Sequence, residues 1–320
     1  MRVLLWHVHG SWTTAFVQGR HDYLVPVTPA RDADGLGRAR TWNWPDSVRE
    51  VPLDRLAECE PDVVVLQRLR DLELARTHLR LEPGRDVPAV WVEHNTPRGD
   101  VGDARHPLAA REDVPVVHVT AFNRVFWDCG RAPVTVIEHG IVDPGLRYTG
   151  ELARAAVVVN EPVRRGRITG TDLLPGFAAD VPLDVFGMQV GGLATHLGVD
   201  PHRVTGYEDL PHHRLHDEVA RRRAYLHPHR WTSLGLSLLE AMHLGMPVVV
   251  LAATEAIEAV PEGAGVVSTR LDVLRAAVRN YLHDPELARA TGLRAREAAL
   301  GRYPLERFLT DWDRLLKEVT

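Results

Sequence analysis

The sequence predicts two α/β domains, each a parallel sheet with helices on both faces. Short apolar runs rich in β-branched residues alternate with amphipathic segments along the whole chain, which is typical of this fold class. The length of 320 residues exceeds one average domain and allows each half to bury its own core. The alternation pauses at a turn-prone Asp-Pro-Gly sequence at residues 143–145, where a domain boundary is expected.

The first half contains six short apolar runs that are expected to form strands. Because their apolar character is continuous, both faces of the predicted sheet are expected to be covered by helices. The first half therefore predicts a doubly wound α/β domain. The expected strands are residues 3–5, 23–27, 62–66, 89–92, 116–119 and 134–137, and the expected helices are 54–59, 71–79 and 122–129.

The second half repeats the alternation and predicts a second α/β domain. Its clearest helix covers residues 236–244, because Gly245 can take the left-handed conformation that ends a helix and Pro247 blocks continuation. A last helix, 305–319, has no strand after it and is expected to pack on the first domain. The other expected helices are 209–222, 271–282 and 286–300, and the expected strands are 155–159, 183–186, 224–226, 247–251 and 265–267.

Composition and charge exclude several function classes. The formal net charge of -5 provides no positive field for a nucleic-acid backbone, and the 45% of hydrophobic residues is typical of an ordinary globular protein. Cys59 and Cys129 are too few for a disulfide framework. The longest apolar run, 246–253, is far too short to span a membrane. A cytoplasmic protein with no nucleic-acid partner and no transmembrane segment is expected.

Candidate sites are expected at the turns that follow the strands. Ligands of open α/β sheets collect at the carboxyl ends of strands, where helix N-termini direct N–H groups toward anions. Because Lys317 is the only lysine, contacts to a phosphate there must come from arginine, histidine or backbone N–H groups. The five turns that stand out are residues 9–12, 93–96, 138–140, 164–166 and 232–236.

The last of these turns opens a segment that is similar to a known donor-site signature. Residues 232–249 read TSLGLSLLEAMHLGMPVV. They resemble the motif E-x-F-G-L-x-x-L-E-A-x-x-x-G-x-P-V-V of the retaining family 4 glycosyltransferases, which have the GT-B fold. Weaker similarity to elements of the same family, including its first glycine turn and its nucleotide-base loop, is found at residues 9–10, 19–23, 136–142, 160–166 and 204–207.

The resemblance implies two Rossmann-like domains that face a cleft. Residues 1–147 would form the acceptor-side domain, 152–302 the nucleotide-sugar donor domain, and 303–320 a helix that returns to the first domain. Members of the family transfer a sugar from a nucleoside-diphosphate sugar with retention at the anomeric carbon. They need no metal ion and no cofactor beyond this donor substrate. The acceptor stays open among a small molecule, a glycan and a lipid-linked molecule.

The resemblance also implies how the segment binds the donor. The Glu240 carboxylate would accept hydrogen bonds from the nucleotide ribose, unless it only complements the dipole of its helix. Backbone N–H groups around Gly235 would hold the diphosphate, and the glycine would allow its close approach. Thr232 stands where the family has a glutamate that contacts the donor sugar, so a weaker contact is expected there. The donor-binding residues expected in this segment are Thr232, Ser233, Leu234, Gly235, Leu236 and Glu240.

Other matched positions imply a catalytic pair and further donor contacts. Arg165 would stabilise the leaving diphosphate, because a guanidinium binds phosphate through two hydrogen bonds, and Arg164 would assist in binding. A solvated loop is the alternative for both arginines. His94 would lie against the donor sugar, unless it is a loop histidine bonded to the backbone. Gly10, in the first glycine turn, and Gly206, in the nucleotide-base loop, are expected to contact the donor.

Three alternatives are weighed against this interpretation. A non-catalytic sugar-nucleotide-binding protein of the same fold is suggested by Thr232 and by the neutral Asn160, which stands where the family has an arginine. A nicotinamide-dependent dehydrogenase is disfavoured because residues 9–14 lack the G-x-G-x-x-G pattern. His212 and His216 have the spacing of two metal ligands on a helix, but the sequence places no third ligand beside them, so no metal site is predicted.

Overall fold

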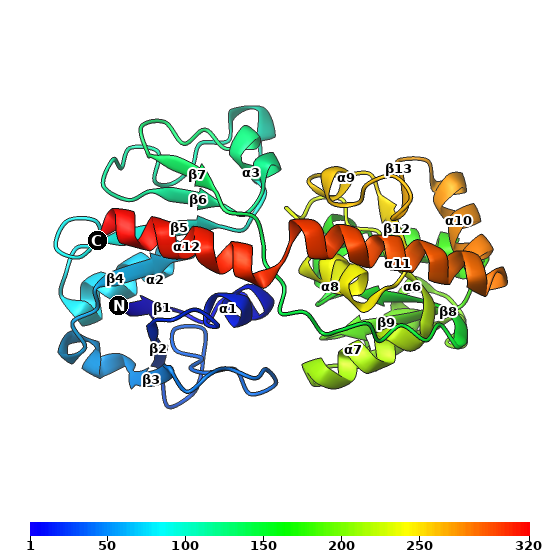
Figure 1. The fold of residues 1–320 in the computed structure, drawn as a ribbon, viewed down its shortest axis with the longest axis horizontal. Helices are drawn as coiled ribbons and strands as arrows, with labels where there is room; N and C mark the ends of the chain where they lie inside the picture. The colour runs from blue at the N-terminus through cyan, green and yellow to red at the C-terminus, as the bar shows by residue number, and fades with distance from the viewer. The chain divides into compact units, whose positions relative to one another are not determined.

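The computed structural model describes all 320 residues, and these form two compact units (Figure 1). Unit 1 comprises Met1–Val142 together with Leu305–Thr320, and unit 2 comprises Asp143–Pro304. Each unit contains one sheet in which all neighbouring strands run parallel. The predicted fold class of two Rossmann-like α/β domains is confirmed.

Unit 1 is built on a seven-stranded sheet with the strand order β3-β2-β1-β4-β5-β6-β7. β1 and β4 are neighbours although β2 and β3 separate them in the sequence, so the strand order reverses between them. All four residues of β4, Val-Val-Val-Leu, are buried, as expected for a strand covered on both faces. The strands are β1 (Arg2–Leu5), β2 (Asp22–Val27), β3 (Val48–Pro52), β4 (Val63–Leu66), β5 (Ala89–Glu93), β6 (Val116–His118) and β7 (Val134–Val136).

β3 is a strand that the sequence analysis did not predict. It forms the edge of the sheet and pairs only with β2. Its sequence, Val-Arg-Glu-Val-Pro, has no continuous apolar run, and Arg49 and Pro52 are exposed. An edge strand contacts water along one side, so it can carry polar residues that a central strand would exclude. The continuous apolar runs that revealed the central strands are therefore absent here.

The helices of unit 1 are short except for the last, α12 (Leu305–Val319), which joins unit 1 although it follows unit 2 in the sequence (Figure 1). Phe308, Trp312 and Leu316, spaced four residues apart, form its buried face. The Trp312 ring lies 5.6 Å from that of Trp12 and 5.1 Å from that of Phe16, both on α1. The other helices are α1 (Gly10–Phe16), α2 (Leu69–Leu74) and α3 (Ala121–Phe126), with helical turns at Leu53–Glu58, Ala75–Leu79 and Val101–Asp103.

Unit 2 has a six-stranded sheet with the order β10-β9-β8-β11-β12-β13, and its strand order reverses between β8 and β11. β10 corrects the prediction that residues 204–207 form a loop, because Val204 is buried and pairs with Leu183 of β9. Like β3, it is an edge strand without a continuous apolar run. The strands are β8 (Leu152–Val158), β9 (Leu183–Gly187), β10 (Val204–Glu208), β11 (Arg222–His227), β12 (Val248–Leu251) and β13 (Gly265–Ser268).

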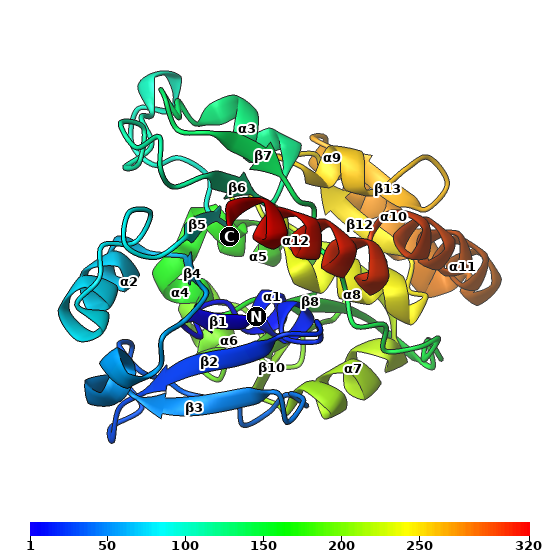
Figure 2. The same ribbon diagram turned by 60° about the vertical axis from the view of Figure 1, so that its left-hand side comes forward.

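The central helix of unit 2 is α8 (Leu236–Leu244), which begins and ends where the sequence predicts. Gly245 follows it in the left-handed conformation, at φ 86°. α7 and α11 pack against α8 (Figure 1, Figure 2). No helix of the structure combines the length and the apolar character needed to cross a membrane. The other helices are α4 (Pro162–Arg165), α5 (Leu174–Ala178), α6 (Leu193–Leu197), α7 (His212–Arg221), α9 (Ala256–Ala259), α10 (Leu271–His283) and α11 (Pro285–Arg302), with helical turns at Gly166–Thr169 and Thr171–Leu173.

The boundary between the units lies a few residues before the end of the expected first domain, 1–147. Asp143 already belongs to unit 2, because its carboxylate pairs with Arg296 of α11 at 2.8 Å. The backbone N–H groups of Arg147 and Tyr148 donate to the carbonyl of Leu244, at the end of α8. The residues at the predicted boundary are therefore held against unit 2.

Candidate functional site

The strand order of unit 2 directs attention to the carboxyl ends of β8 and β11. These strands are neighbours, and the chain continues from them toward opposite edges of the sheet. Ligands of open α/β sheets bind where the strand order reverses in this way. Residues 159–173 leave β8 at this point and residues 228–236 leave β11. Together they contain the predicted site residues Arg164, Arg165, Thr232, Ser233, Leu234, Gly235 and Leu236.

Hydrogen bonds hold these two segments together. The backbone N–H groups of Arg230 and Trp231 donate to the carbonyl of Ile168 at 2.9 and 3.1 Å. The guanidinium of Arg230 also donates to the Asp172 carboxylate at 2.9 Å. The structure thus brings the segment that contains Arg165 beside the segment that leads into α8.

The two predicted arginines differ in their surroundings. Arg164 is exposed, and its guanidinium donates to the Glu161 carboxylate at 2.8 Å. Arg165 is half-buried at the end of α4. Burial, the neighbouring His227 and the positive charge of Arg165 together lower the pKa of His229 on the β11 segment. Arg165 is therefore the arginine whose charge reaches the second segment.

The turn before α8 is fixed by the segment that follows β12. The Thr254 hydroxyl donates to the carbonyl of Thr232 at 2.7 Å, and the N–H of Glu255 donates to the carbonyl of Ser233 at 3.3 Å. Ser233 and Leu234 are buried. The backbone that leads to the N-terminus of α8 is consequently held in place before any ligand binds.

Gly235 precedes α8 in an extended conformation, and Leu236 is the first residue of the helix. The first N–H groups of a helix have no carbonyl partners within it, so they and the helix dipole favour an anion at this point. A side chain at Gly235 would overlap the imidazole ring of His227. Close packing on His227 thus requires the glycine, independently of its predicted role in admitting a diphosphate.

His227 and His229 lie side by side below this turn, with a nitrogen–nitrogen distance of 3.0 Å. Both are buried, with 2% and 8% of their surfaces exposed. Burial lowers the pKa of His227 from 6.5 to about 3. At neutral pH the His227 ring is therefore uncharged, and the positive charge of this part of the site comes from Arg165 and the α8 dipole.

The burial of His227 predicts that acid destabilises the protein. An unfolded histidine takes up a proton near pH 6.5, whereas folded His227 does so only near pH 3. Between pH 6.5 and pH 3 the protein takes up a proton at this histidine when it unfolds. The contribution of His227 to the free energy of unfolding is therefore complete above pH 6.5 and is lost as the pH falls toward 3. We expect the free energy of unfolding to fall by up to about 1.4 kcal/mol per pH unit for this histidine.

Urea denaturation at several pH values measures this slope. His227→Gln is expected to reduce the slope between pH 6.5 and 3, whereas His283→Gln, at an exposed position, should leave it unchanged. An identical slope in the wild type and His227→Gln would contradict the assignment of this proton to His227.

Glu240 lies one turn into α8, beyond the turn that contains Gly235. Its side chain is only 10% exposed, and each carboxylate oxygen contacts a histidine of α7. Oε1 is 3.5 Å from Nε2 of His212, and Oε2 is 3.5 Å from Nε2 of His216. Burial raises the pKa of Glu240, but the contacts with the two histidines lower it by a larger amount. The pKa of Glu240 therefore lies well below its usual value. The carboxylate is ionised at neutral pH.

The partnership of Glu240 with the two histidines was missed in the sequence. The spacing of His212 and His216 suggested a pair on one helix face, but no nearby residue suggested a third group. The structure supplies that group from the next helix, because α7 packs beside α8 (Figure 2). Glu240 lies near the two histidines because α7 and α8 pack together, and the spacing of residues along one helix gives no information about such packing.

Gly206 lies within β10 instead of a loop. A side chain there would overlap the carbonyl of Val190, in the turn after β9. The carboxylate of Glu208, at the end of β10, accepts hydrogen bonds from the N–H groups of this turn, at 2.9 Å for Val190 and 3.0 Å for Gly191. Gly206 is thus required for packing of the turn at residues 189–191.

The predicted residues of unit 1 lie among histidines that follow three strands. His94 comes directly after β5, and its ring centre lies 4.0 Å from that of His9 and 5.1 Å from that of Trp12. Burial, with the charges of His9 and His139, lowers the pKa of His94 well below its usual value. Gly10, next to His9, is the first residue of α1. An uncharged imidazole thus lies at the carboxyl edge of the unit 1 sheet.

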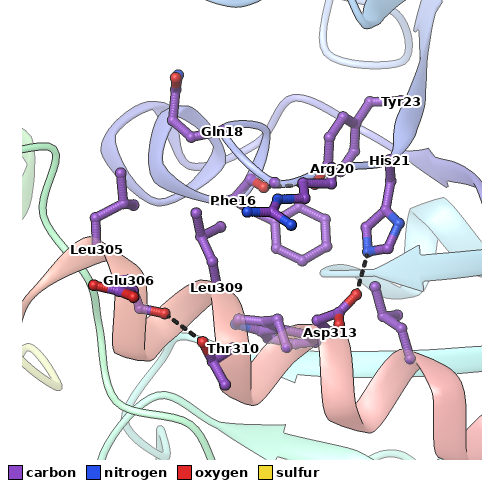
Figure 3. Close-up of a pocket in the computed structure, with 13 residues that line it drawn as sticks. Phe16, Gln18, Arg20, His21, Tyr23, Leu305, Glu306, Leu309, Thr310 and Asp313 are labelled. Carbon is purple, nitrogen blue, oxygen red and sulfur yellow. Dashed lines mark hydrogen bonds and ion pairs between the residues drawn. The ribbon is translucent and has the colours of Figure 1, made fainter.

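Unit 1 also contains a pocket of about 660 Å³ between α12 and the turn that joins α1 to β2 (Figure 3). Leu309 and Arg20 line it, and Nε2 of His21 lies 3.3 Å from the Asp313 carboxylate at its side. The pocket borders the beginning of β2, whereas the predicted site residues of unit 1 follow the ends of strands. None of those predicted residues lines it, so the pocket is not part of the candidate site.

Comparisons with known proteins find a family match within unit 2. Residues 188–298 match the family model described as glycosyl transferases group 1, a range that includes Gly206, the turn at 232–236 and Glu240 but not Arg165. No curated protein sequence matches the chain.

Several solved structures share the fold over nearly the whole chain. Sucrose-phosphate synthase from Thermosynechococcus elongatus is 16% identical, with a TM-score of 0.72 over 99% of this chain and 98% of that one. HepE from Anabaena, in complex with UDP-glucose, is 15% identical, with a TM-score of 0.69 over 99% and 100%. A glycosyltransferase from Rickettsia africae is 12% identical, with a TM-score of 0.66 over 99% and 98%. The family match in unit 2 supports a glycosyltransferase enzyme, and the shared fold of both units is the GT-B fold of these glycosyltransferases.

Proposed function

We propose that this glycosyltransferase takes its sugar from a nucleoside-diphosphate sugar bound in unit 2, at the carboxyl ends of β8 and β11. The observation that carries the proposal is that the Arg165 segment is hydrogen-bonded to the segment that leads into α8, where the strand order reverses. A guanidinium and the positive end of a helix dipole both favour a diphosphate. HepE, which shares the fold, has been solved with UDP and with UDP-glucose, so uridine nucleotides are the first donors to test.

The proposed transfer retains the configuration at the anomeric carbon and needs neither a metal ion nor a cofactor beyond the donor. Negative charge grows on the diphosphate as its bond to the sugar breaks. Arg165 and the N–H groups at the start of α8 would stabilise that charge. We propose that His94 acts at the donor sugar, and that unit 1 binds the acceptor, a small molecule, a glycan or a lipid-linked molecule. The cytoplasm is the proposed location.

Titration calorimetry of the full-length protein tests the donor class. We expect saturable binding of one nucleoside diphosphate per chain, with UDP measured first and GDP and ADP compared with it. Release of the nucleoside diphosphate from the matching sugar nucleotide measures turnover. If none of these nucleotides bound, the proposed donor site would be wrong.

Arg165→Ala is expected to slow turnover about a hundredfold, the effect of removing one group that stabilises charge in a transition state. Donor affinity should change far less, because the charge on the diphosphate grows only as the bond breaks. The values of kcat and KM for nucleoside diphosphate release measure the two effects separately. Arg167→Ala is the matched control, since Arg167 is exposed on the same segment and pairs with Asp172. A higher KM with unchanged kcat would limit Arg165 to binding.

A further inference from the structure

Three side chains of unit 2 form a cluster with the composition of a metal site. His212 and His216 lie one turn apart on α7 and face Glu240 of α8. One nitrogen from each imidazole and one carboxylate oxygen all lie within 4.8 Å of one another. A pair of histidines at this spacing on one helix face, joined by a glutamate from elsewhere, is a donor set that binds zinc in proteins.

Two distances in the cluster are close to those between neighbouring ligands of one metal ion. Each carboxylate oxygen is 3.5 Å from an imidazole nitrogen, beyond the range of about 2.7–3.2 Å for an N–H···O hydrogen bond. Two ligands bound tetrahedrally at about 2.1 Å from Zn²⁺ lie about 3.4 Å apart. The ligand atoms all lie within 4.8 Å of one another, so for one ion to be shared, any wider separation among them would have to close to about 3.4 Å.

The cluster is also accessible to an ion from solvent. The side chain of His216 is 7% exposed and that of Glu240 is 10% exposed, but that of His212 is 20% exposed. Three protein ligands leave one tetrahedral position open for water or another ligand. The arrangement thus resembles an open metal site.

We propose that His212, His216 and Glu240 bind a divalent transition-metal ion such as Zn²⁺, and that this ion competes with the nucleotide for Glu240. Imidazole and carboxylate ligands suit Zn²⁺, and the carboxylate offsets part of its charge. The competition rests on the proposed function, in which the Glu240 carboxylate accepts hydrogen bonds from the ribose. A carboxylate bound to a metal has fewer lone pairs to offer the ribose hydroxyls. Metal binding would then inhibit a transferase whose own chemistry needs no metal.

The metal site is tested first, without nucleotide. Full-length protein freed of metal with a chelator is titrated with Zn²⁺ by calorimetry, and with Co²⁺, whose visible absorption reports tetrahedral coordination. His212→Ala and His216→Ala should each weaken the tightest Zn²⁺ site at least about tenfold, since even loss of an outer partner of a metal ligand has an effect of that size. His213→Ala is the matched control, because His213 is exposed between them on α7.

The control is needed because the chain has 17 histidines that could bind Zn²⁺ weakly. Unchanged affinity in both cluster variants, or an equal loss in His213→Ala, would overturn the metal site. Circular dichroism and thermal unfolding confirm that each variant is folded. Should His216→Ala unfold, the more exposed His212→Ala decides the question.

The competition is tested with UDP on the same preparations. Saturating Zn²⁺ should raise the Kd of UDP in the wild type at least about tenfold, matching the loss of about 1.4 kcal/mol or more of ribose contacts. Addition of a chelator should return the Kd of UDP to its value without Zn²⁺. In His216→Ala the Kd of UDP should depend little on Zn²⁺, which separates the protein site from Zn²⁺ bound to UDP itself. Equal or tighter UDP binding with Zn²⁺ would overturn the competition. If UDP did not bind in the absence of metal, the donor proposal would be overturned, and the proposed competition with it. The metal site would still be judged by the Zn²⁺ titration alone.

Discussion

Replacement of Glu240 by alanine is expected to weaken nucleotide binding at least about tenfold. A hydrogen bond to a charged group contributes about 1.5–3 kcal/mol, and about 1.4 kcal/mol corresponds to a tenfold change in Kd. The ionised carboxylate can accept bonds from ribose hydroxyls in addition to its contacts with His212 and His216, because it offers about four lone-pair positions. Glu240→Gln should be intermediate, since the amide keeps one acceptor oxygen but loses the charge. Calorimetry with UDP in the presence of a chelator measures the change.

The structure changes what this variant is expected to do to stability. From the sequence alone, the only structural role expected of Glu240 is to complement the dipole of its helix, which contributes about 0.3–1 kcal/mol to stability. In the structure it is buried against two histidines, so alanine leaves a space beside them and glutamine is the safer variant. Glu297→Gln, at an exposed position of α11, is the matched control. Wild-type affinity for UDP in both Glu240 variants would make Glu240 a structural residue and remove the main support for the donor site.

The central parts of both units could be predicted because their signals are local. The run Val63–Leu66 is apolar throughout, as a strand covered on both faces requires. The end of α8 could be predicted because Gly245 and Pro247 act on the backbone at their own positions. The edge strands β3 and β10 were missed, since water contact along one side allows polar residues that resemble a loop.

The candidate site could be predicted only as far as one segment extends. Residues 232–240 lie in a single turn and the helix that follows it. Their resemblance to a donor-site signature therefore also predicted how they are arranged along that turn and helix. The packing of Gly235 against His227 and the contacts of Glu240 with α7 join separate elements, and no sequence spacing encodes them. The reversal of strand order between β8 and β11 likewise depends on the pairing of strands. It is this pairing that brings the Arg165 segment beside the segment that leads into α8.

Trp312→Ala is expected to destabilise unit 1 by about 3–5 kcal/mol, the usual cost of replacing a buried tryptophan with alanine. Trp312 is 2% exposed, and its ring meets Trp12 and Phe16 of α1 and Phe308 of α12 itself. These edge-to-face contacts are lost together with the buried area. Since whole domains are stable by only about 5–15 kcal/mol, the loss is large enough to shift the unfolding transition of unit 1 clearly.

Urea denaturation followed by fluorescence can assign that shift to unit 1, because every tryptophan except Trp231 lies there. The fluorescence midpoint should fall in Trp312→Ala, and calorimetry can show whether a second transition belongs to unit 2. Arg314→Ala is the matched control, since Arg314 is exposed on the same helix and its ion pair with Asp311 spans 3.7 Å; a change within about 0.5 kcal/mol is expected there. An unchanged midpoint in Trp312→Ala would mean that α12 contributes little to unit 1, contrary to its buried face of Phe308, Trp312 and Leu316.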